Sequence, residues 1–335
     1  MRVKLRSIPF MYKLLGSVLL LVVCFVISML FGAQETAPHE LWLALTSAAS
    51  EGNVLTLQEI RLPRELAAML VGAALAVSGA IMQGVTRNPL ADPGLLGLTS
   101  GANLALAVIF ACIPGISYFG IMLACFIGAA AGGGLVVGLG AVRRRNLSPV
   151  RIVLAGAAIS TFLQAATEGI SLAFKISKDV SMWTAGGLIG TNWEQIQAVA
   201  LVIVAGIAVS VMYSGHLTIL SLSDEVAVGL GQKLARIKFI LFALVILLTG
   251  AAVALAGNIA FLGLMIPHIV RKIVGTDYRY ILPFSVFAGA AFMLLADTLA
   301  RTINAPYETP MAAIVAMAGL PFFLLVVRKG GKALS

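Results

Sequence analysis

Long apolar stretches alternate with short polar segments along the whole of this 335-residue chain. Ten stretches are apolar over a length that crosses a lipid bilayer or comes close to it. They fall at residues 14–32, 62–83, 95–113, 117–141, 150–174, 195–213, 238–256, 259–275, 281–300 and 310–327. The pattern therefore predicts an all-α integral membrane protein with ten transmembrane helices.

Composition supports this prediction and limits the domain organisation. Sixty per cent of the residues are hydrophobic and 11% are charged, and the mean hydropathy is +1.02. A soluble domain of this length could not bury that much apolar surface in one core, so lipid must cover it. The longest connection between spans, at residues 33–61, is too short to form a soluble domain. We therefore expect a single transmembrane domain over residues 1–335.

The basic residues orient the predicted spans. With the N-terminus in the cytoplasm, eighteen of the 23 basic residues lie on the cytoplasmic side, as the positive-inside rule requires. These eighteen are Arg2, Lys4, Arg6, Lys13, Arg87, Arg143, Arg144, Arg145, Arg151, Lys233, Arg236, Lys238, Arg271, Lys272, Arg279, Arg328, Lys329 and Lys332. The remaining five are Arg61, Arg64, Lys175, Lys178 and Arg301. We therefore predict a multi-pass protein of the cytoplasmic membrane with both termini in the cytoplasm. Basic clusters placed in this way argue against nucleic-acid binding.

Neither an ion-coupling site nor an ATP-binding loop is evident. Glu168 and Asp297 lie toward the predicted outer ends of their spans, and no carboxylate pair faces another at the midplane, which argues against an ion-coupled secondary transporter. The sequence Gly331-Lys332 is followed by Ala333 and lacks the rest of a phosphate-binding loop. If transport is active, its energy must come from a partner protein.

The chain also lacks the residue groupings of an enzyme or a metal site. The histidines and cysteines are isolated from one another and show no metal-ligand spacing. They are His39, His216, His268, Cys24, Cys112 and Cys125. We therefore predict no catalytic residue, no metal site and no cofactor.

A cytoplasmic loop at about residues 214–237 is the best candidate for docking such a partner. Ser223 suits a helix N-cap, and Asp224 and Glu225 would follow in the first turn. The residues that follow are apolar or small and predict a short, closely packing helix. They include Ala227, Gly229, Leu230 and Gly231. Such a helix could insert into a groove on another protein or lie on the membrane surface, and the residues alone leave both readings open.

Small residues at four-residue spacing occur inside two spans. Gly128, Gly132, Gly134 and Gly138 form two overlapping G-x-x-x-G patterns, and Gly72, Ala76 and Gly79 form a similar pattern in the second span. This spacing predicts close approach of helix backbones in a compact bundle.

Two proline motifs have a structural interpretation. Arg87-Asn88-Pro89 would end the second span in a turn, and it could shape an inner gate. Pro267 and His268 would kink and end the short span at 259–275.

Several motifs together resemble the iron–siderophore and vitamin B12 permeases of binding-protein-dependent ABC importers. The resemblance runs from Arg61 to the last span. Its motifs are Arg61-Leu62-Pro63-Arg64, Gln83 to Pro93, Leu96-Gly97, Ser100-Gly101-Ala102, Trp183 to Gly187, Asp224 to Gly231, Gly257 to Arg271, and Asp297 to Arg301. Their order and positions make the resemblance specific.

The resemblance implies a ten-helix permease that pairs with a second permease, either an identical chain or a paralogue. Two cytoplasmic ATPase subunits would dock below it and an extracytoplasmic ligand-binding protein above it. The 223–231 segment corresponds to a coupling helix that fits an ATPase groove. Arg61, Arg64 and Arg301 correspond to arginines that pair with glutamates of the binding protein, although an arginine at a span mouth can also reach lipid headgroups. The implied function is import of an iron–siderophore complex, with haem or vitamin B12 as alternatives.

Overall fold

The computed structural model describes residues 9–32, 36–46, 52–94, 97–141, 149–305 and 307–331. These residues form helices and no β-strand, which confirms the all-α prediction for the described part of the chain. Several residues used above lie outside the described ranges. They are Arg2, Lys4, Arg6, Leu96, Arg143, Arg144, Arg145, Lys332 and Ala333.

Ten helices coincide with the ten predicted spans. They are α1 (Phe10–Leu30), α4 (Leu62–Thr86), α5 (Leu98–Cys112), α6 (Tyr118–Ala141), α7 (Pro149–Ala173), α9 (Trp193–Met212), α12 (Leu234–Ala256), α13 (Leu262–Val274), α14 (Tyr278–Thr302) and α15 (Met311–Gly331). Shorter elements connect them, namely α2 (Pro38–Thr46), α3 (Gly52–Thr56), the π-helical turn η2 (Leu57–Arg61), α8 (Ser177–Thr184), α10 (Ser214–Leu220) and α11 (Asp224–Gly229).

Seven segments of the described chain are long and apolar enough to cross a membrane, so the chain is a multi-pass membrane protein. These segments contain α1, α4, α6, α9, α12, α14 and α15. Of the other three helices, α5 has 15 residues, α13 has 13, and α7 has 25 residues with Glu168 among them. The count of ten spans therefore stays a prediction.

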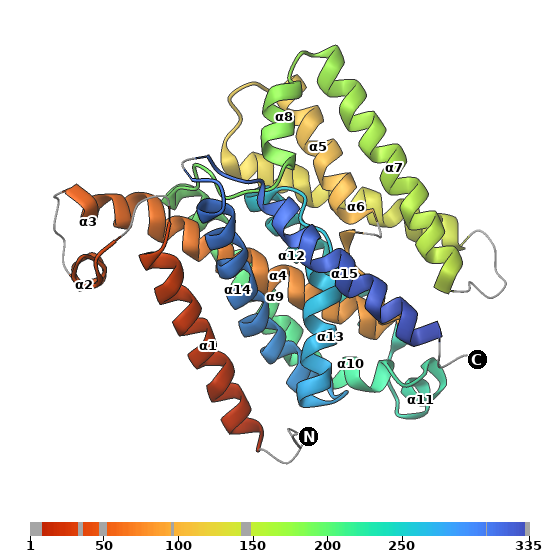
Figure 1. The fold of residues 1–335 in the computed structure, drawn as a ribbon. Helices are drawn as coiled ribbons and strands as arrows, with labels where there is room; N and C mark the ends of the chain where they lie inside the picture. Colours follow the sequence, from red (N-terminus) through yellow and green to blue (C-terminus); the bar gives the residue numbers. More distant parts are fainter. Residues whose placement is uncertain are drawn as a thin grey trace.

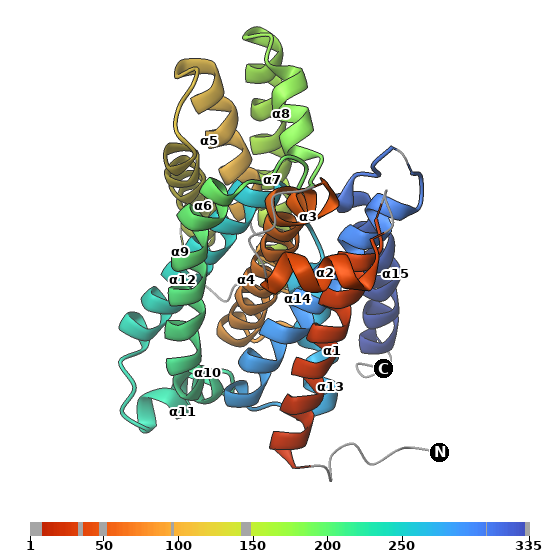
Figure 2. The same ribbon diagram turned by 90° about the vertical axis from the view of Figure 1, so that its left-hand side faces the viewer.

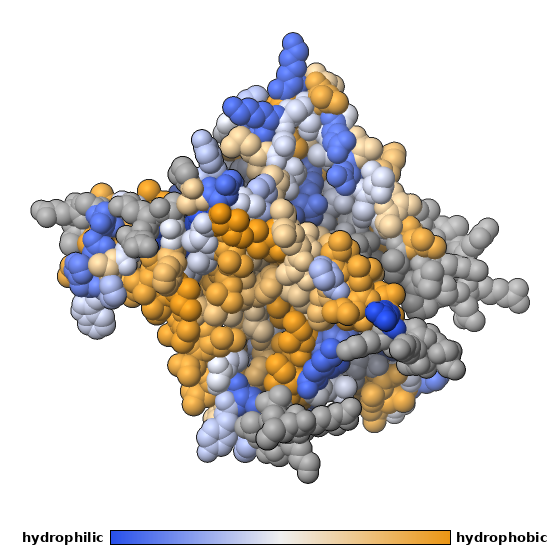
Figure 3. Space-filling view, in the orientation of Figure 1, coloured by the Kyte–Doolittle hydropathy of each residue, from blue (hydrophilic) through white to orange (hydrophobic). Residues whose placement is uncertain are grey.

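Helix α4 is the centre of the bundle (Figure 1). It packs against α9, α12, α13 and α14. In its most apolar window 83% of the residues are buried, compared with 22% in α1 and 17% in α15. Figure 3 shows that the outer helices give one face a broad apolar area, with more hydrophilic side chains above and below it. This distribution fits a protein whose middle is surrounded by lipid.

The two ends of the bundle differ. The end that carries α10 and α11, here called the lower end, also holds the start of α1 and the end of α15 (Figures 1 and 2). The end that carries α2, α3 and α8 is called the upper end. Helix α1 therefore begins, and helix α15 ends, at the same end of the bundle, as an even number of spans requires.

Glycines allow α4 to approach two neighbours at backbone distance. A methyl group on Gly72 would overlap the carbonyl oxygen of Gly289 in α14, and one on Gly79 would overlap that of Gly263 in α13. The predicted packing role of Gly72 and Gly79 is therefore confirmed.

Only one of the two glycine patterns in α6 packs in the same way. Gly128 and Gly132 meet the backbone of α5 and of Gly97, which precedes it. Gly134 and Gly138 have open space where a Cβ would lie. Two of the four glycines therefore bring α6 against α5, and the other two face away from it.

The prediction that Pro267 and His268 end their span is wrong. Helix α13 continues past both residues to Val274 and ends at Gly275, whose φ is 95°. Proline lacks the N–H that would bond to the carbonyl four residues earlier, here that of Gly263. The Gln83 side-chain amide of α4 donates to the Gly263 and Leu264 carbonyls at 3.3 and 3.2 Å. Because a neighbouring helix supplies the missing donor, α13 can contain a proline without ending there.

We predict that Gly79→Val destabilises the protein by about 1–3 kcal/mol or more, because a side chain must force α4 and α13 apart. The control is Gly134→Val, which makes the same helix substitution where the Cβ meets nothing within 4 Å. The measurement is thermal unfolding of the purified protein in detergent. Equal losses in the two variants would show that close packing at Gly79 is not required.

Candidate functional site

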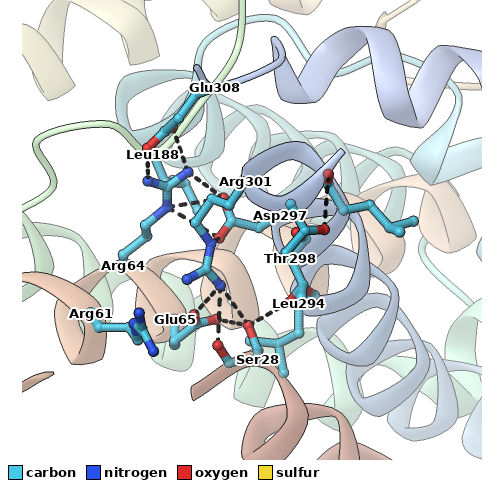
Figure 4. A network of polar contacts seen from close by, with 12 residues as sticks. Ser28, Arg61, Arg64, Glu65, Leu188, Leu294, Asp297, Thr298, Arg301 and Glu308 are labelled. Atoms are coloured by element: carbon cyan, nitrogen blue, oxygen red, sulfur yellow. Dashed lines mark hydrogen bonds and ion pairs between the residues drawn. The ribbon is translucent and has the colours of Figure 1, made fainter. Parts of the chain in front are cut away.

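A buried cluster of charged residues joins α1, α4, α14 and the 303–310 loop at the upper end (Figure 4). Arg64 of α4 is at its centre. Its Nε lies 3.1 Å from both carboxylate oxygens of Asp297, and its Nη1 and Nη2 donate to Glu308 at 2.7 and 2.9 Å. Asp297 is fully buried, and Arg64 is 8% exposed. The guanidinium therefore clamps two carboxylates, one on α14 and one on the following loop.

Arg301 forms the second half of the cluster. Its Nη2 donates to Glu65 at 2.5 Å, and its Nε lies 2.9 Å from Asp297. The Ser28 hydroxyl of α1 donates to Glu65, and it accepts a hydrogen bond of 2.8 Å from Thr298. Glu65 is fully buried and Arg301 is 5% exposed. This half ties α1 to α4 and α14.

Arg61 lies at the edge of the cluster, on η2. Its Nη1 donates to the Met29 carbonyl at 2.7 Å and to the Thr36 hydroxyl at 2.6 Å. Gly32 lies against Arg61 and Arg301, because a Cβ there would meet both guanidinium groups.

The three arginines and three carboxylates of the cluster balance in formal charge. Burial of an ion is tolerated when it is paired and hydrogen-bonded, which is the state of Arg64 and Arg301. Glu308 lies on the loop above the spans. Burial raises the pKa of Glu308, but the hydrogen bonds from Arg64 together with the charges of Arg64 and Arg301 outweigh burial and hold that pKa below its ordinary value.

The structure brings together the three arginines that the sequence assigned to binding-protein docking. Arg64 and Arg301 are paired inside the chain, while Arg61 is partly exposed. Their docking role stays a prediction. Sequence reasoning missed Glu65, Glu308 and Ser28. A signal for one of them was present, since Arg61–Glu65 has the same four-residue spacing as Asp297–Arg301.

At the lower end, α11 takes the form predicted for the coupling segment. The Ser223 hydroxyl caps it by accepting from the Val226 N–H at 3.0 Å. Gly231 closes the turn after it with a φ of 78°, a conformation that favours glycine. Ala227 is fully buried, whereas Val226, Val228 and Leu230 are exposed at 43%, 57% and 63%. A short, capped helix therefore presents apolar side chains outward. Glu225 is exposed in the first turn of α11. A Cβ on Gly229 would meet no atom within 4 Å.

Asp224 links α11 to two spans. Lys238 of α12 donates to it at 2.8 Å, and Arg87 at the end of α4 lies 3.4 Å from it. The hydrogen bond from Lys238 holds the pKa of Asp224 below its ordinary value, and Arg87 acts in the same direction. The structure thus pairs Arg87 of the predicted gate motif with Asp224 of the predicted coupling segment, two motifs that the sequence analysis did not connect.

The turn after α4 has the predicted local form. Arg87 adopts a left-handed conformation with a φ of 51°, which ends the helix. The Asn88 side chain accepts from the Leu90 N–H at 3.0 Å across Pro89. This turn fixes where Arg87 meets α11.

Further polar contacts fasten the lower parts of α4, α13 and α14 to one another. Arg271 donates to Gln83 at 3.0 Å and to the Tyr278 hydroxyl at 3.1 Å. His268 packs edge-on against Phe322 of α15, with ring centroids 5.5 Å apart. His268 is therefore an interhelical packing residue and does not cap a helix end.

The cavities in the described part of the chain include two that are lined by residues of several helices. One, of about 950 Å³, lies at the lower end between α9, α10 and the start of α12. The other, of about 360 Å³, lies between α5, α7 and α8. Within the described ranges, no group of three His, Cys, Asp or Glu side chains is placed to hold a metal ion.

Comparison with known proteins gives a consistent picture. The model of the FecCD transport family matches residues 20–329. The iron(3+)-hydroxamate import system permease protein FhuB of Bacillus subtilis is 42% identical over 309 residues, which are 92% of this chain and 80% of that protein. The hemin transport system permease protein HmuU of Yersinia pestis is 38% identical over 324 residues, covering 94% of this chain and 95% of that protein.

A solved structure has the same fold over almost the whole chain. It is described as an inward-facing conformation of a metal-chelate type ABC transporter. It superposes with a TM-score of 0.81 at 28% identity and covers 95% of this chain and 99% of that one.

We predict that Arg301→Leu lowers the free energy of unfolding by about 3–5 kcal/mol, because it leaves Glu65 buried without its cation. Glu65→Gln in the same background should recover part of the loss. The control is Arg279→Leu, which removes a 65% exposed side chain from its pair with Asp277 and should cost about 1 kcal/mol or less. Thermal unfolding in detergent measures all three. An Arg301→Leu variant as stable as Arg279→Leu would contradict the structural importance of the cluster.

Proposed function

The chain belongs to the FecCD transport family, and from this premise we propose that it is the permease subunit of a binding-protein-dependent ABC importer. It would form one transmembrane domain of ten helices in the cytoplasmic membrane, with both termini in the cytoplasm. ATP would be hydrolysed by a separate subunit. The observation that carries this proposal is α11, a capped helix that exposes apolar side chains at the end of the bundle where the basic segments gather.

The proposed cargo is an iron–siderophore complex. The relatives by name import iron chelated by hydroxamate, citrate or enterobactin, and one imports hemin. Haem, or vitamin B12, is therefore the alternative cargo for the same machinery. An ion-coupled mechanism is less well supported, because the buried carboxylates Glu65 and Asp297 are paired with arginines and Glu168 lies near the upper end of its helix.

We propose that α11 inserts into a groove of the ATPase and passes its movement to the spans. Two physical links support this route. Asp224 pairs with Arg87 at the end of α4, and with Lys238 in the first turns of α12. Helix α4 in turn packs at backbone distance on α13 and α14. A displacement of α11 would thus act directly on the central helix, and alternating access would follow at the interface with a second permease chain.

Docking of an extracytoplasmic binding protein is proposed at the upper end, around Arg61, Arg64 and Arg301. The arginine cluster would fix the shape of this surface. Arg61 is the residue best placed to meet a partner carboxylate, because it is partly exposed whereas Arg64 and Arg301 are buried. Arg64 and Arg301 are neutralised by Asp297, Glu65 and Glu308, so they would support this surface by holding its shape.

The function is tested by uptake of iron-55 chelates into cells or proteoliposomes that carry the complete system. We expect uptake that vanadate blocks and that a proton uncoupler leaves intact while ATP is maintained. Uptake with the opposite sensitivities would refute the ABC mechanism.

The same assay tests the coupling helix. Leu230→Asp should abolish vanadate-sensitive uptake without lowering the amount of permease in the membrane, because a charge would replace the apolar contact with the ATPase. Leu45→Asp serves as the control, since Leu45 is 52% exposed on α2 at the opposite end. Normal uptake by Leu230→Asp would exclude this docking surface.

For binding-protein docking, we predict that Arg61→Glu weakens capture of the binding protein by roughly tenfold at low salt, because like charges would then face each other. Arg64→Glu is not used, since it would place a third carboxylate beside Asp297 and Glu308. Arg279→Glu is the control because it makes the same charge change at the lower end. Capture is measured by surface binding to permease in nanodiscs, and unchanged affinity of Arg61→Glu would exclude Arg61 from the interface.

A further inference from the structure

The cavity of about 360 Å³ between α5, α7 and α8 is lined mainly by polar side chains. Six hydroxyl side chains, three amides and one carboxylate face it, with only Leu172 and Val180 as apolar residues. Polar side chains are costly inside a membrane unless they face protein or water, and they mark substrate pathways. Packing alone does not require so many of them at one place.

Part of this lining lies on one stripe of α7. Gln164, Glu168 and Ser171 follow one another at spacings of four and three residues, so they share a helix face. Glu168 is exposed in this single chain. A carboxylate avoids lipid, so this face of α7 meets water, a ligand or another protein chain. Because Glu168 lies within two turns of the upper end of α7, beside α8, water can reach the cavity.

Three hydroxyls of the lining already use their protons within the chain. Thr167, Ser171 and Thr184 each donate their hydroxyl proton to a carbonyl of their own helix, at 2.8, 2.6 and 2.8 Å. Their oxygens keep lone pairs that can accept. These three side chains therefore present acceptors to the cavity.

Asn103 of α5 adds a buried acceptor without a partner. It is 7% exposed, it lines the cavity, and its Oδ1 has no hydrogen-bond partner. A buried carbonyl left unpaired costs free energy that a bound donor would recover. Asn103 and the carboxylate of Glu168 thus extend the set of acceptors, and no lysine or arginine is among the described residues that line the cavity.

We propose that this cavity is a subsite that receives a hydrogen-bond-donating, preferably cationic, arm of the transported chelate, with Glu168 as its charge-selective residue. The inference rests on the proposed function, because it assigns part of the cargo to a place in the permease. The volume is near the lower end of the ~300–1,000 Å³ typical of ligand pockets, so it suits one arm of a chelate and not a whole complex.

The subsite selects between classes of iron chelate by charge. Three hydroxamates, with one negative charge each, neutralise iron(III), and their backbones carry amide N–H donors and in some cases a free ammonium group. Three catecholates carry twice that charge and leave the complex strongly anionic. A cavity with a carboxylate, and with no basic side chain among its described residues, disfavours the anionic class. The expected cargo is therefore a neutral or cationic hydroxamate chelate.

The test compares two linear tris-hydroxamate complexes that differ only in a terminal ammonium group, free in one and N-acetylated in the other. The wild-type permease should prefer the ammonium form, and Glu168→Gln should reduce this preference by about tenfold, the effect of losing one charge-assisted hydrogen bond. Uptake of the acetylated form should fall less than uptake of the ammonium form, because only the ammonium form loses an ion pair. Glu194→Gln, an exposed glutamate in the first turn of α9, is the matched control and should keep the preference.

Binding of the corresponding gallium(III) complexes to purified permease in nanodiscs gives a readout that needs neither the ATPase nor the binding protein. If Glu168→Gln loses the ammonium preference in this binding assay, the subsite is supported. If the transport assay fails at the same time, only the proposed function is refuted. Equal binding of the two complexes to the wild type, or a preference that survives Glu168→Gln, overturns the subsite. Asn103→Leu supplies a second variant and should weaken binding of both complexes.

Discussion

Inside a bundle surrounded by lipid, a charged or backbone polar group has no water to bond to, and this constraint governs most of the structure. Arg64 and Arg301 can be buried because Asp297, Glu65 and Glu308 surround them. The Gly263 carbonyl, left without a donor by Pro267, is satisfied by Gln83 from another helix. In the Arg64–Asp297, Arg301–Glu65 and Gln83–Gly263 contacts, the two partners lie on helices distant in sequence. The same interactions that satisfy polar groups therefore also fix how the helices are assembled.

The sequence predicts well what depends on local composition. Apolar length located the ten helices, and small residues at four-residue spacing identified the contacts of Gly72 and Gly79. The capped form of α11 follows from Ser223 and the acidic residues after it. These features depend on residues close together in the chain, where periodicity and capping rules apply.

Features that depend on distant partners were not predictable in this way. A proline in a short span is normally read as a stop, and only the position of Gln83 explains why α13 continues to Val274. The arginines at the upper end could be grouped from their motifs, but the sequence did not show that Arg64 and Arg301 are paired within the chain. Glu308 follows α14 by six residues in a loop, where no periodicity connects it with Arg64. The pairing of Arg87 with Asp224 likewise joins residues 137 positions apart.

Helix α4 connects these distant parts because it runs from one polar end to the other. Its first turn carries Arg64 and Glu65, and Arg87 caps its last turn beside α11. Between them nine of its seventeen buried residues are alanine or glycine, which lets its neighbours approach its backbone closely. A helix packed this closely cannot absorb a displacement by changing rotamers. Movement at Asp224 would therefore reach α13 and α14 as a shift of whole helices.

Glu168 stands apart from the pairing that holds elsewhere in the bundle. Glu65 and Asp297 are buried against arginines, whereas Glu168 is exposed on α7, and no described cation lines the cavity it faces. A carboxylate avoids lipid, so Glu168 requires water, a ligand or a partner chain beside α7. Under the proposed function, Glu168 would therefore mark the face of the bundle that is turned toward the transport path. Apolar periodicity could not identify that face, since lipid and neighbouring helices are equally apolar.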